Sequence, residues 1–402
     1  MGWKPETLRK RRVIAVDLFA GAGGMSLGAR WAGVDVRLAV EIDPHATRTY
    51  KTNHPGTKVL TKDIRSVKRI RTGKSSDTRI LFGGPPCQGF STSNQRTRNA
   101  ENKQNWLYRE FLRLVKQWKP QWVVFENVKG ITETEGGLFL EKVQTELSSY
   151  GYTTALWVLN AADFGVPQCR SRVFVVGSSD GHEVPKPRCL LTPSRYITVK
   201  KALAGLPYLS NGASENRLPY RTATRSAYAK LMREDLSDCD NHLVSRNAPH
   251  VIQRYAHVPQ GGNWEDIPLS LMENYRDRTR CHTGIYHRLS LKEPSVVIGN
   301  FRKNMLIHPE QDRGLSVREA ARLQSFPDWY VFQGSIGFQQ QQVGNSVPPL
   351  LAQAVFEAIL RADSRPAENG AVRSDRLPHD GKTPGKRFQK RPSILTLSKK
   401  VD

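Results

Sequence analysis

Short apolar segments alternate with helical patterns over the first 180 residues of this 402-residue chain, and this alternation limits the fold more than any other feature. Segments that predict buried strands lie at residues 13–19, 36–40, 80–82, 122–125 and 173–177. Helical periodicity occurs between them, most clearly at residues 106–118. Because strands that alternate with helices usually pair in parallel, the pattern predicts an α/β fold with a mostly parallel sheet.

The rest of the chain differs in composition and periodicity. From residue 181 to residue 315, Pro, Ser, Arg and Asn are frequent and long periodic segments are few, which predicts a second, smaller and irregular domain. Order returns at residues 316–327, and residues 344–360 predict a loop that leads into an amphipathic helix. Residues 364–402 hold ten Lys or Arg and four Asp or Glu, which predicts a disordered basic tail. We therefore expect a catalytic domain at residues 10–180 and a second domain with its hinge at residues 181–330. A segment at residues 335–362 would return to the catalytic domain, and residues 364–402 would form the tail.

The composition favours a nucleic-acid partner in a reducing compartment. The 61 Lys and Arg exceed the 37 Asp and Glu, so the formal net charge is +24 and the surface concentrates polyanions. The chain has five cysteines, at positions 87, 169, 189, 239 and 281. An odd number without a Cys-x-x-Cys pair argues against both a disulfide framework and a zinc site. No apolar run approaches membrane length or resembles a signal peptide, so we expect a cytoplasmic protein.

One cysteine lies in a segment suited to display a thiol. The apolar run at residues 80–82 is followed by Gly83-Gly84-Pro85-Pro86-Cys87-Gln88-Gly89-Phe90-Ser91. The prolines fix φ and lack N–H groups, and the glycines permit close approach of the backbone to a ligand. The alternative is an inert core cysteine beside a tight turn. The neighbouring segments favour a catalytic thiol at Cys87.

A second glycine-rich segment, Asp17-Leu18-Phe19-Ala20-Gly21-Ala22-Gly23-Gly24, occurs where the first strand turns into a helix. Such a turn brings the backbone close to a nucleotide-like ligand, although an ordinary tight turn has a similar composition. Ser26 occupies the third glycine position of the dinucleotide fingerprint, which argues against an oxidoreductase. Glu41 ends the next apolar run, where a carboxylate accepts hydrogen bonds from ribose hydroxyls. An adenosine cofactor without a pyrophosphate, such as S-adenosylmethionine, agrees with these features.

Further candidates lie at the ends of other strands. Asp63, followed by Ile64, comes after a third strand, where it either accepts from an adenine amino group or is an ordinary surface residue. Glu126 follows the strand at residues 122–125, at the sheet edge where ligands bind; buried there, it could keep its proton and act as a donor or acid. Arg170 and Arg172 lie two apart, so in an extended segment they share a face suited to phosphate or carbonyl oxygens, or form a solvated edge.

Taken in order, these segments resemble the conserved blocks of the bacterial C5-cytosine DNA methyltransferases of restriction-modification systems, over residues 13–177 and 316–360. The resemblance implies a Rossmann-like catalytic domain with an inserted target-recognition domain. It implies catalytic roles for Cys87, Glu126, Arg170 and Arg172. It implies S-adenosylmethionine binding by Asp17, Phe19, Gly21, Gly23, Gly24, Glu41, Ile42, Asp63, Ile64, Pro85, Asn345 and Ser346. Ile42 replaces an aromatic residue that many relatives carry after the ribose-binding glutamate.

The same resemblance implies transfer of a methyl group from S-adenosylmethionine to C5 of cytosine within a specific double-stranded DNA sequence. The Cys87 thiolate would add to C6 of a flipped-out base. Glu126 would hold N3 and the exocyclic amine, and Arg172 would contact O2. Arg170 would orient Glu126 or a phosphate, and the loop at residues 91–104 would close over the base.

The resemblance also implies partners. Residues 181–291 would read double-stranded DNA in the major groove, and residues 316–327 would organise that recognition domain. A companion restriction endonuclease would be a functional partner without necessarily touching the chain. We expect a cytoplasmic, nucleoid-associated monomer that uses neither a metal nor a membrane.

Two other functions stay open at this point. An RNA cytosine-C5 methyltransferase would use the same chemistry, although the long insert between residues 177 and 315 favours duplex DNA. A catalytically silent DNA-binding protein of the same fold is the second alternative. The presence of Cys87, Glu126, Arg170 and Arg172 argues against it.

Overall fold

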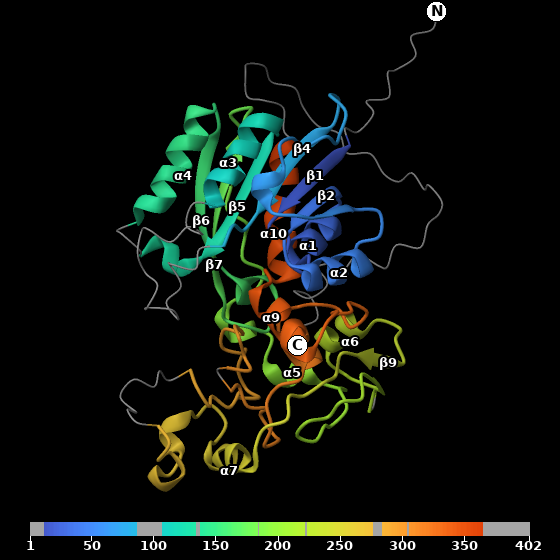
Figure 1. Ribbon diagram of the computed structural model, residues 1–402, viewed down its shortest axis with the longest axis vertical. Coiled ribbons are helices and arrows are strands. Elements are labelled where there is room, and N and C mark those ends of the chain that lie inside the picture. The colour runs from blue at the N-terminus through green and yellow to red at the C-terminus, as the bar shows by residue number, and fades with distance from the viewer. Residues whose placement is uncertain are drawn as a thin grey trace, which may run out of the picture.

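In the part of the chain that the structure describes, seven strands form one sheet in the order β3-β2-β1-β4-β5-β7-β6 (Figure 1). Neighbours from β3 to β5 are parallel, whereas β7 is antiparallel to both β5 and β6. The strands are β1 (Val13–Leu18), β2 (Asp35–Glu41), β3 (Lys58–Thr61), β4 (Thr78–Gly83), β5 (Trp122–Val128), β6 (Thr153–Asn160) and β7 (Ser171–Ser178). The predicted mostly parallel α/β sheet is confirmed, and the carboxyl ends of its parallel strands meet at one edge.

The structure is a computed structural model that describes residues 12–86, 107–133, 137–183, 185–221, 223–275, 284–303 and 305–364. The predicted nucleophile Cys87, the loop at residues 91–104 and the tail after residue 364 lie outside these ranges. Pro85 and Pro86 are described, so the site can be followed up to the residue before the thiol.

Helices cover both faces of the sheet. On one face α1 (Gly24–Ala32) packs beside α10 (Pro349–Asp363), although they come from opposite ends of the fold (Figure 1). Their backbones approach so closely that a Cβ at Gly28 would lie 2.4 Å from the Pro349 carbonyl oxygen. The other face packs against α3 (Leu107–Trp118) and α4 (Leu138–Ser149). Successive strand residues such as Leu81 and Phe82 therefore enter different apolar clusters.

The C-terminal part of the fold differs from the sequence prediction. The predicted loop into the last helix is present at residues 346–348, but its predicted start at Gly344 is wrong, because α9 (Ile336–Asn345) includes this glycine. Gly344 permits a close approach rather than a turn, since a Cβ there would lie 2.1 Å from the Gly299 carbonyl oxygen. The predicted amphipathic pattern of α10 is also wrong, because every residue from Pro349 to Phe356 is buried. The segment Ile336–Asp363 is long and apolar enough to cross a membrane, yet 83% of its most apolar part is buried inside the protein, as in the core helix of a soluble protein.

Between β7 and α8 (Val317–Leu323) the described chain forms short elements. They include α5 (Val199–Leu203), β8 (Arg217–Pro219), α6 (Ala227–Arg233), β9 (Asp238–Asp240) and α7 (Pro249–His257). A separate apolar cluster around Tyr255 and Tyr286 includes α7, which lies at the opposite end of the molecule from the sheet (Figure 1). These short elements agree with an irregular second domain. The boundaries of that domain at residues 181–330 stay a prediction.

Helix α8 and the turn after it carry buried charges that the protein pairs internally. Ser316 and Glu319 form a capping box, and Arg313 Nη2 lies 2.7 Å from Glu319 Oε1. Arg322 and Asp328 form a second ion pair whose side chains are both fully buried. Burial alone would raise the pKa of Asp328, but the Arg322 charge outweighs it and lowers that pKa. The structural role predicted for residues 316–327 agrees with these contacts.

We expect Asp328→Asn to lower the free energy of unfolding by about 3–5 kcal/mol, because it leaves the Arg322 guanidinium buried without its counter-charge. Urea denaturation at neutral pH measures the change. In the wild type the stabilisation should persist at neutral pH and disappear as the pH falls through the lowered pKa of Asp328. Asp35→Asn, which removes a solvent-exposed partner of Arg12 and Arg37, is the control and should cost less than about 1 kcal/mol. Equal costs for the two variants would contradict this account.

Candidate active site

A cavity of about 1190 Å³ lies at the carboxyl ends of the parallel strands. It is lined by most of the residues that the sequence predicts, namely Asp17, Phe19, Gly21, Gly24, Glu41, Ile42, Asp63, Ile64, Pro85, Glu126, Arg170, Arg172, Asn345 and Ser346. Gly23 is described but does not line the cavity. Pro86, directly before Cys87, does line it. The fold therefore brings segments from both ends of the chain to one site.

The glycine-rich turn between β1 and α1 forms one wall of the cavity. Phe19, Gly21 and Gly23 all have positive φ, at 59°, 53° and 91°, which makes the turn tight. A Cβ at Gly21 would have no protein atom within 4 Å, so this part of the turn is open to a ligand. A Cβ at Gly23 would instead lie 2.5 Å from His54 Nε2, and one at Gly24 would lie 2.5 Å from the Val347 carbonyl oxygen. Gly21 thus permits ligand approach, whereas Gly23 and Gly24 permit packing.

Glu41 at the end of β2 is held by the backbone around it. Its Oε2 accepts from Gly21 N at 2.8 Å, and its Oε1 accepts from Ile42 N and Asp43 N, each at 2.9 Å. Because a carboxylate offers about four acceptor positions, this arrangement fixes Glu41 and leaves it able to accept from a further donor. Ile42 is 62% exposed beside it, so an apolar side chain stands at the rim of the cavity.

The other two carboxylates predicted to bind the cofactor, Asp17 and Asp63, have different surroundings. Asp17 is buried beneath the glycine-rich turn, where it accepts from Ser26 Oγ at 2.6 Å, and burial raises its pKa well above the usual value. Asp63 accepts from the Arg65 backbone N and guanidinium, and these hydrogen bonds lower its pKa. Ile64, which follows it, is buried. Asp17 therefore supports the turn from below, and Arg65 already contacts Asp63.

Glu126 and Arg172 form an ion pair in the cavity wall. Glu126 lies on β5 and Arg172 on the adjacent antiparallel β7, with Arg172 Nε 3.0 Å from Glu126 Oε1. Their side chains are only 11% and 10% exposed. Burial raises the pKa of Glu126, although the charges of Arg172 and Arg170 act in the opposite direction. Gly84 is close by, since a Cβ there would lie 2.4 Å from Glu126 Oε2.

Arg170 connects separate segments of the site. Its Nη1 donates to the Ile298 carbonyl at 2.7 Å, and its Nη2 donates to the carbonyls of Gly344 at 2.8 Å and Ser346 at 3.3 Å. The side chain is fully buried. The guanidinium thus donates to three backbone carbonyls, while its charge also acts on Glu126, in the direction that lowers the pKa of that carboxyl. Arg170 holds the Gly344–Ser346 wall against the start of β7.

Sequence reasoning missed two residues that support the site. Gln168 is buried, and its amide accepts from Ile298 N at 2.9 Å and donates to Gln324 Oε1 at 3.1 Å. Asn127 Nδ2 donates to the Pro85 carbonyl at 3.2 Å, which steadies the backbone that leads to Cys87. Asn127 directly follows Glu126 in the sequence, which is the signal that could have identified it. Gln168 offers only its position two residues before Arg170.

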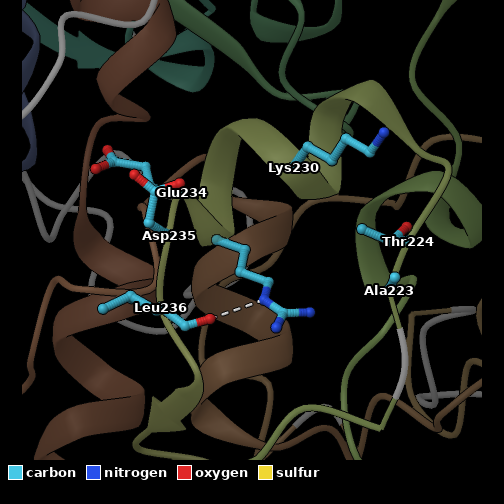
Figure 2. A pocket seen from close by; sticks show the side chains of 7 residues that line it. Ala223, Thr224, Lys230, Glu234, Asp235 and Leu236 are labelled. Atoms are coloured by element: carbon cyan, nitrogen blue, oxygen red, sulfur yellow. Dashed lines mark hydrogen bonds between the residues drawn. The ribbon is translucent and has the colours of Figure 1, made fainter.

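A second hollow, of about 330 Å³, lies on the region between β7 and α8. It is lined by Ala223, Thr224, Lys230, Arg233, Glu234, Asp235 and Leu236. The Arg233 guanidinium donates to the Leu236 carbonyl at 2.9 Å, the dashed line in Figure 2, and lies 4.0 Å from the ring centre of Tyr220. The arginine that lines this hollow is thus already bound by neighbouring residues of the protein. None of the predicted site residues lies there, so the larger cavity is the stronger candidate for the chemistry.

Comparison with known proteins agrees with this geometry. A family model described as C-5 cytosine-specific DNA methylase matches residues 13–361. Type II methyltransferase M1.HphI of Haemophilus parahaemolyticus is 39% identical over 354 residues, which cover 87% of each chain. Type II methyltransferase M.DdeI of Desulfomicrobium norvegicum is 35% identical over 368 residues, covering 86% of this chain and 88% of the relative. A crystal structure from E. coli, described as a candidate DNA modification methyltransferase encoded within a prophage, superposes with a TM-score of 0.68 at 26% identity, over 88% of this chain and 100% of the other.

Proposed function

The chain belongs to the C5-cytosine-specific DNA methylase family, so it is a DNA (cytosine-5-)-methyltransferase, and from that premise we propose how its residues act. The proposal is that one cavity holds S-adenosylmethionine beside a cytosine flipped out of a specific double-stranded sequence. One observation supports this proposal: Glu41, the Glu126–Arg172 ion pair and the Pro85-Pro86 segment all line the same cavity.

The cavity residues fit S-adenosylmethionine. The open position at Gly21 allows a ligand to lie against the turn, and the fixed Glu41 carboxylate suits ribose hydroxyls. Ile42 would pack against the adenine ring. The Asp63 carboxylate would accept a hydrogen bond from the adenine amino group while it also accepts from Arg65. Phe19, Pro85, Asn345, Ser346 and the backbone around Gly23 and Gly24 complete the proposed binding site. S-adenosylmethionine, when bound, supplies a methyl group on a positively charged sulfur.

We assign the reaction to four side chains. The Cys87 thiolate adds to C6 of cytosine, which makes C5 nucleophilic, and loss of the C5 proton after methylation expels the thiolate. Glu126 holds N3 and the exocyclic amine, and its raised pKa favours a carboxyl that shares a proton with N3. Arg172 contacts O2 and fixes Glu126. Arg170 is a positioning residue, because its hydrogen bonds hold the wall formed by Gly344 and Ser346.

The reaction requires a duplex partner and a flipped base, because C6 is inaccessible inside a stacked helix. We propose that residues 181–291 read the DNA sequence. The names of the type II relatives support a place in a restriction-modification system, with a companion endonuclease that shares the sequence but need not touch the chain. On this proposal the protein acts as a monomer on nucleoid DNA in the cytoplasm.

Replacing Glu41 with alanine should weaken S-adenosylmethionine binding by roughly 10- to 100-fold, the scale of one or two hydrogen bonds to a charged group. Isothermal titration calorimetry without DNA measures this directly. Asp35→Ala, on the same strand but outside the cavity, is the control and should bind normally. Unchanged cofactor affinity in Glu41→Ala would overturn the ribose assignment.

The proposed activity can be tested with purified protein and S-adenosylmethionine that carries a radioactive methyl group. Unmethylated bacterial DNA and total RNA are supplied in parallel, and the products are digested to nucleosides and separated. We expect label in 5-methyldeoxycytidine from DNA. Label confined to RNA, or to another base, would contradict the proposal.

A further inference from the structure

We propose that a basic strip beside the cavity binds the phosphates of duplex DNA next to the methylated sequence. The basic strip consists of six exposed residues in the connection between β3 and β4, namely Lys62, Arg65, Lys68, Arg69, Arg71 and Lys74. The inference rests on the proposed function, because it takes the enzyme's own DNA as the polyanion.

Buried apolar residues and exposed basic residues alternate regularly along this connection. Ile64, Val67 and Ile70 occur at every third position, and they are only 5%, 6% and 5% exposed. All three pack in the apolar cluster that contains α3. Because these side chains are directed into the protein, the basic residues between them face solvent.

Hydrogen bonds to α3 hold the backbone of the strip in place. Arg113 Nη2 donates to the Val67 carbonyl at 2.8 Å, and Gln117 Oε1 accepts from Ile70 N at 2.8 Å. Trp118 Nε1 donates to the Thr72 carbonyl at 3.3 Å. These contacts follow α3 over several residues, so the backbone that carries the basic side chains is fixed against this helix.

Five of the six cations of the strip have no ion-pair partner among the described residues. Asp63 is the only acidic residue between positions 62 and 74, and it pairs with Arg65. Among the described residues, no ion pair forms with Lys62, Lys68, Arg69, Arg71 or Lys74. Like charges held close together repel one another, and a polyanion removes that repulsion while releasing its own counterions.

The position of the strip selects DNA among polyanions. Lys62 and Arg65 line the same cavity as Glu126 and Arg172, so the strip begins at the rim of the active site. A duplex that delivers a cytosine into the cavity brings phosphates to the protein surface around it, and the strip is part of that surface. An acidic protein has no comparable reason to lie beside the catalytic cavity.

The test is the salt dependence of binding to a duplex of random sequence, about 60 base pairs long. The strip variant carries Lys68→Gln, Arg69→Gln and Arg71→Gln, three residues that do not line the cavity. The control variant carries Lys51→Gln, Lys142→Gln and Arg361→Gln, which remove the same charge from exposed positions on α2 (Pro44–Asn53), α4 and α10. Fluorescence anisotropy gives the affinity at each salt concentration.

We expect the slope of log affinity against log salt to fall in magnitude by roughly two to three in the strip variant, since each phosphate contact contributes about 0.9. The control slope should not change. An unchanged slope in the strip variant, or an equal fall in the control, would overturn the proposal and leave an acidic protein as the candidate partner. Wild-type protein that methylates no DNA would refute the proposed function instead, because the slopes are measured without methylation.

Discussion

Replacing Cys87 with alanine should reduce methyl transfer by more than about 10⁴-fold, because no other group can then activate C5. The described chain enters the cavity wall at Pro85 and Pro86, directly before this residue. Neither proline has an N–H group, and the Asn127 amide bonds the Pro85 carbonyl, so the approach to the thiol is stiff. Transfer of a labelled methyl group to DNA under single-turnover conditions measures the loss.

The Cys87→Ala variant should still bind S-adenosylmethionine and DNA, since the residues proposed for those contacts are unchanged. Calorimetry and anisotropy on the same protein sample check both. Cys189→Ala, which removes an exposed thiol that does not line the cavity, is the control and should react at the wild-type rate. Methyl transfer by Cys87→Ala within tenfold of wild type would contradict the covalent mechanism.

Replacing Glu126 with glutamine should slow the chemical step by about 10²- to 10³-fold, the range seen when a group that stabilises transition-state charge is removed. Glutamine keeps the shape and can donate an N–H hydrogen bond, but its amide cannot transfer a proton to N3. It also leaves Arg172 without a charged partner in a site where both side chains are about one-tenth exposed. Single-turnover rates at saturating DNA separate this effect from weaker binding.

The pH dependence gives the Glu126 prediction a definite sign. Because burial raises its pKa, the protonated carboxyl persists to higher pH than in a surface glutamate. The wild-type rate should therefore fall as the pH rises through that pKa, in opposition to the gain from ionising Cys87. Glu126→Gln should lose the fall, whereas the exposed control Glu141→Gln should retain it. A fall of unchanged size in Glu126→Gln would exclude Glu126 as its source.

The parts of this molecule that sequence patterns predict best are local. The strand at residues 13–19 and the glycines after it follow from burial periodicity and turn geometry, and the structure has β1 and a tight turn there. The sequence predicts Glu41 and Glu126 at strand ends; Glu41 ends β2, whereas Glu126 lies inside β5, which continues to Val128. Both line the cavity, because parallel strands end at one edge of the sheet. Short-range rules are sufficient in such cases.

Other features depend on contacts between distant residues. Arg170 bonds the carbonyl of Ile298, which is 128 residues away, so its neighbours in the sequence could not reveal that partner. Gly344 suggested a turn because glycine usually marks one, whereas its role is the approach of α9 to Gly299. Asp63 is a candidate acceptor for the adenine amino group, and the sequence pattern does not show that Arg65, two residues later, also binds it. In each case the partner depends on packing or pairing that local patterns do not reveal.

The most direct test of the central claim is bisulfite sequencing of DNA from a host that lacks cytosine methylation and expresses this protein. A parallel culture expresses Cys87→Ala. We predict protected cytosines within one short sequence motif in the wild-type culture and none in the control. Uniform conversion in both cultures, with the wild-type protein present in soluble form, would contradict the assignment of this cavity to cytosine methylation in DNA.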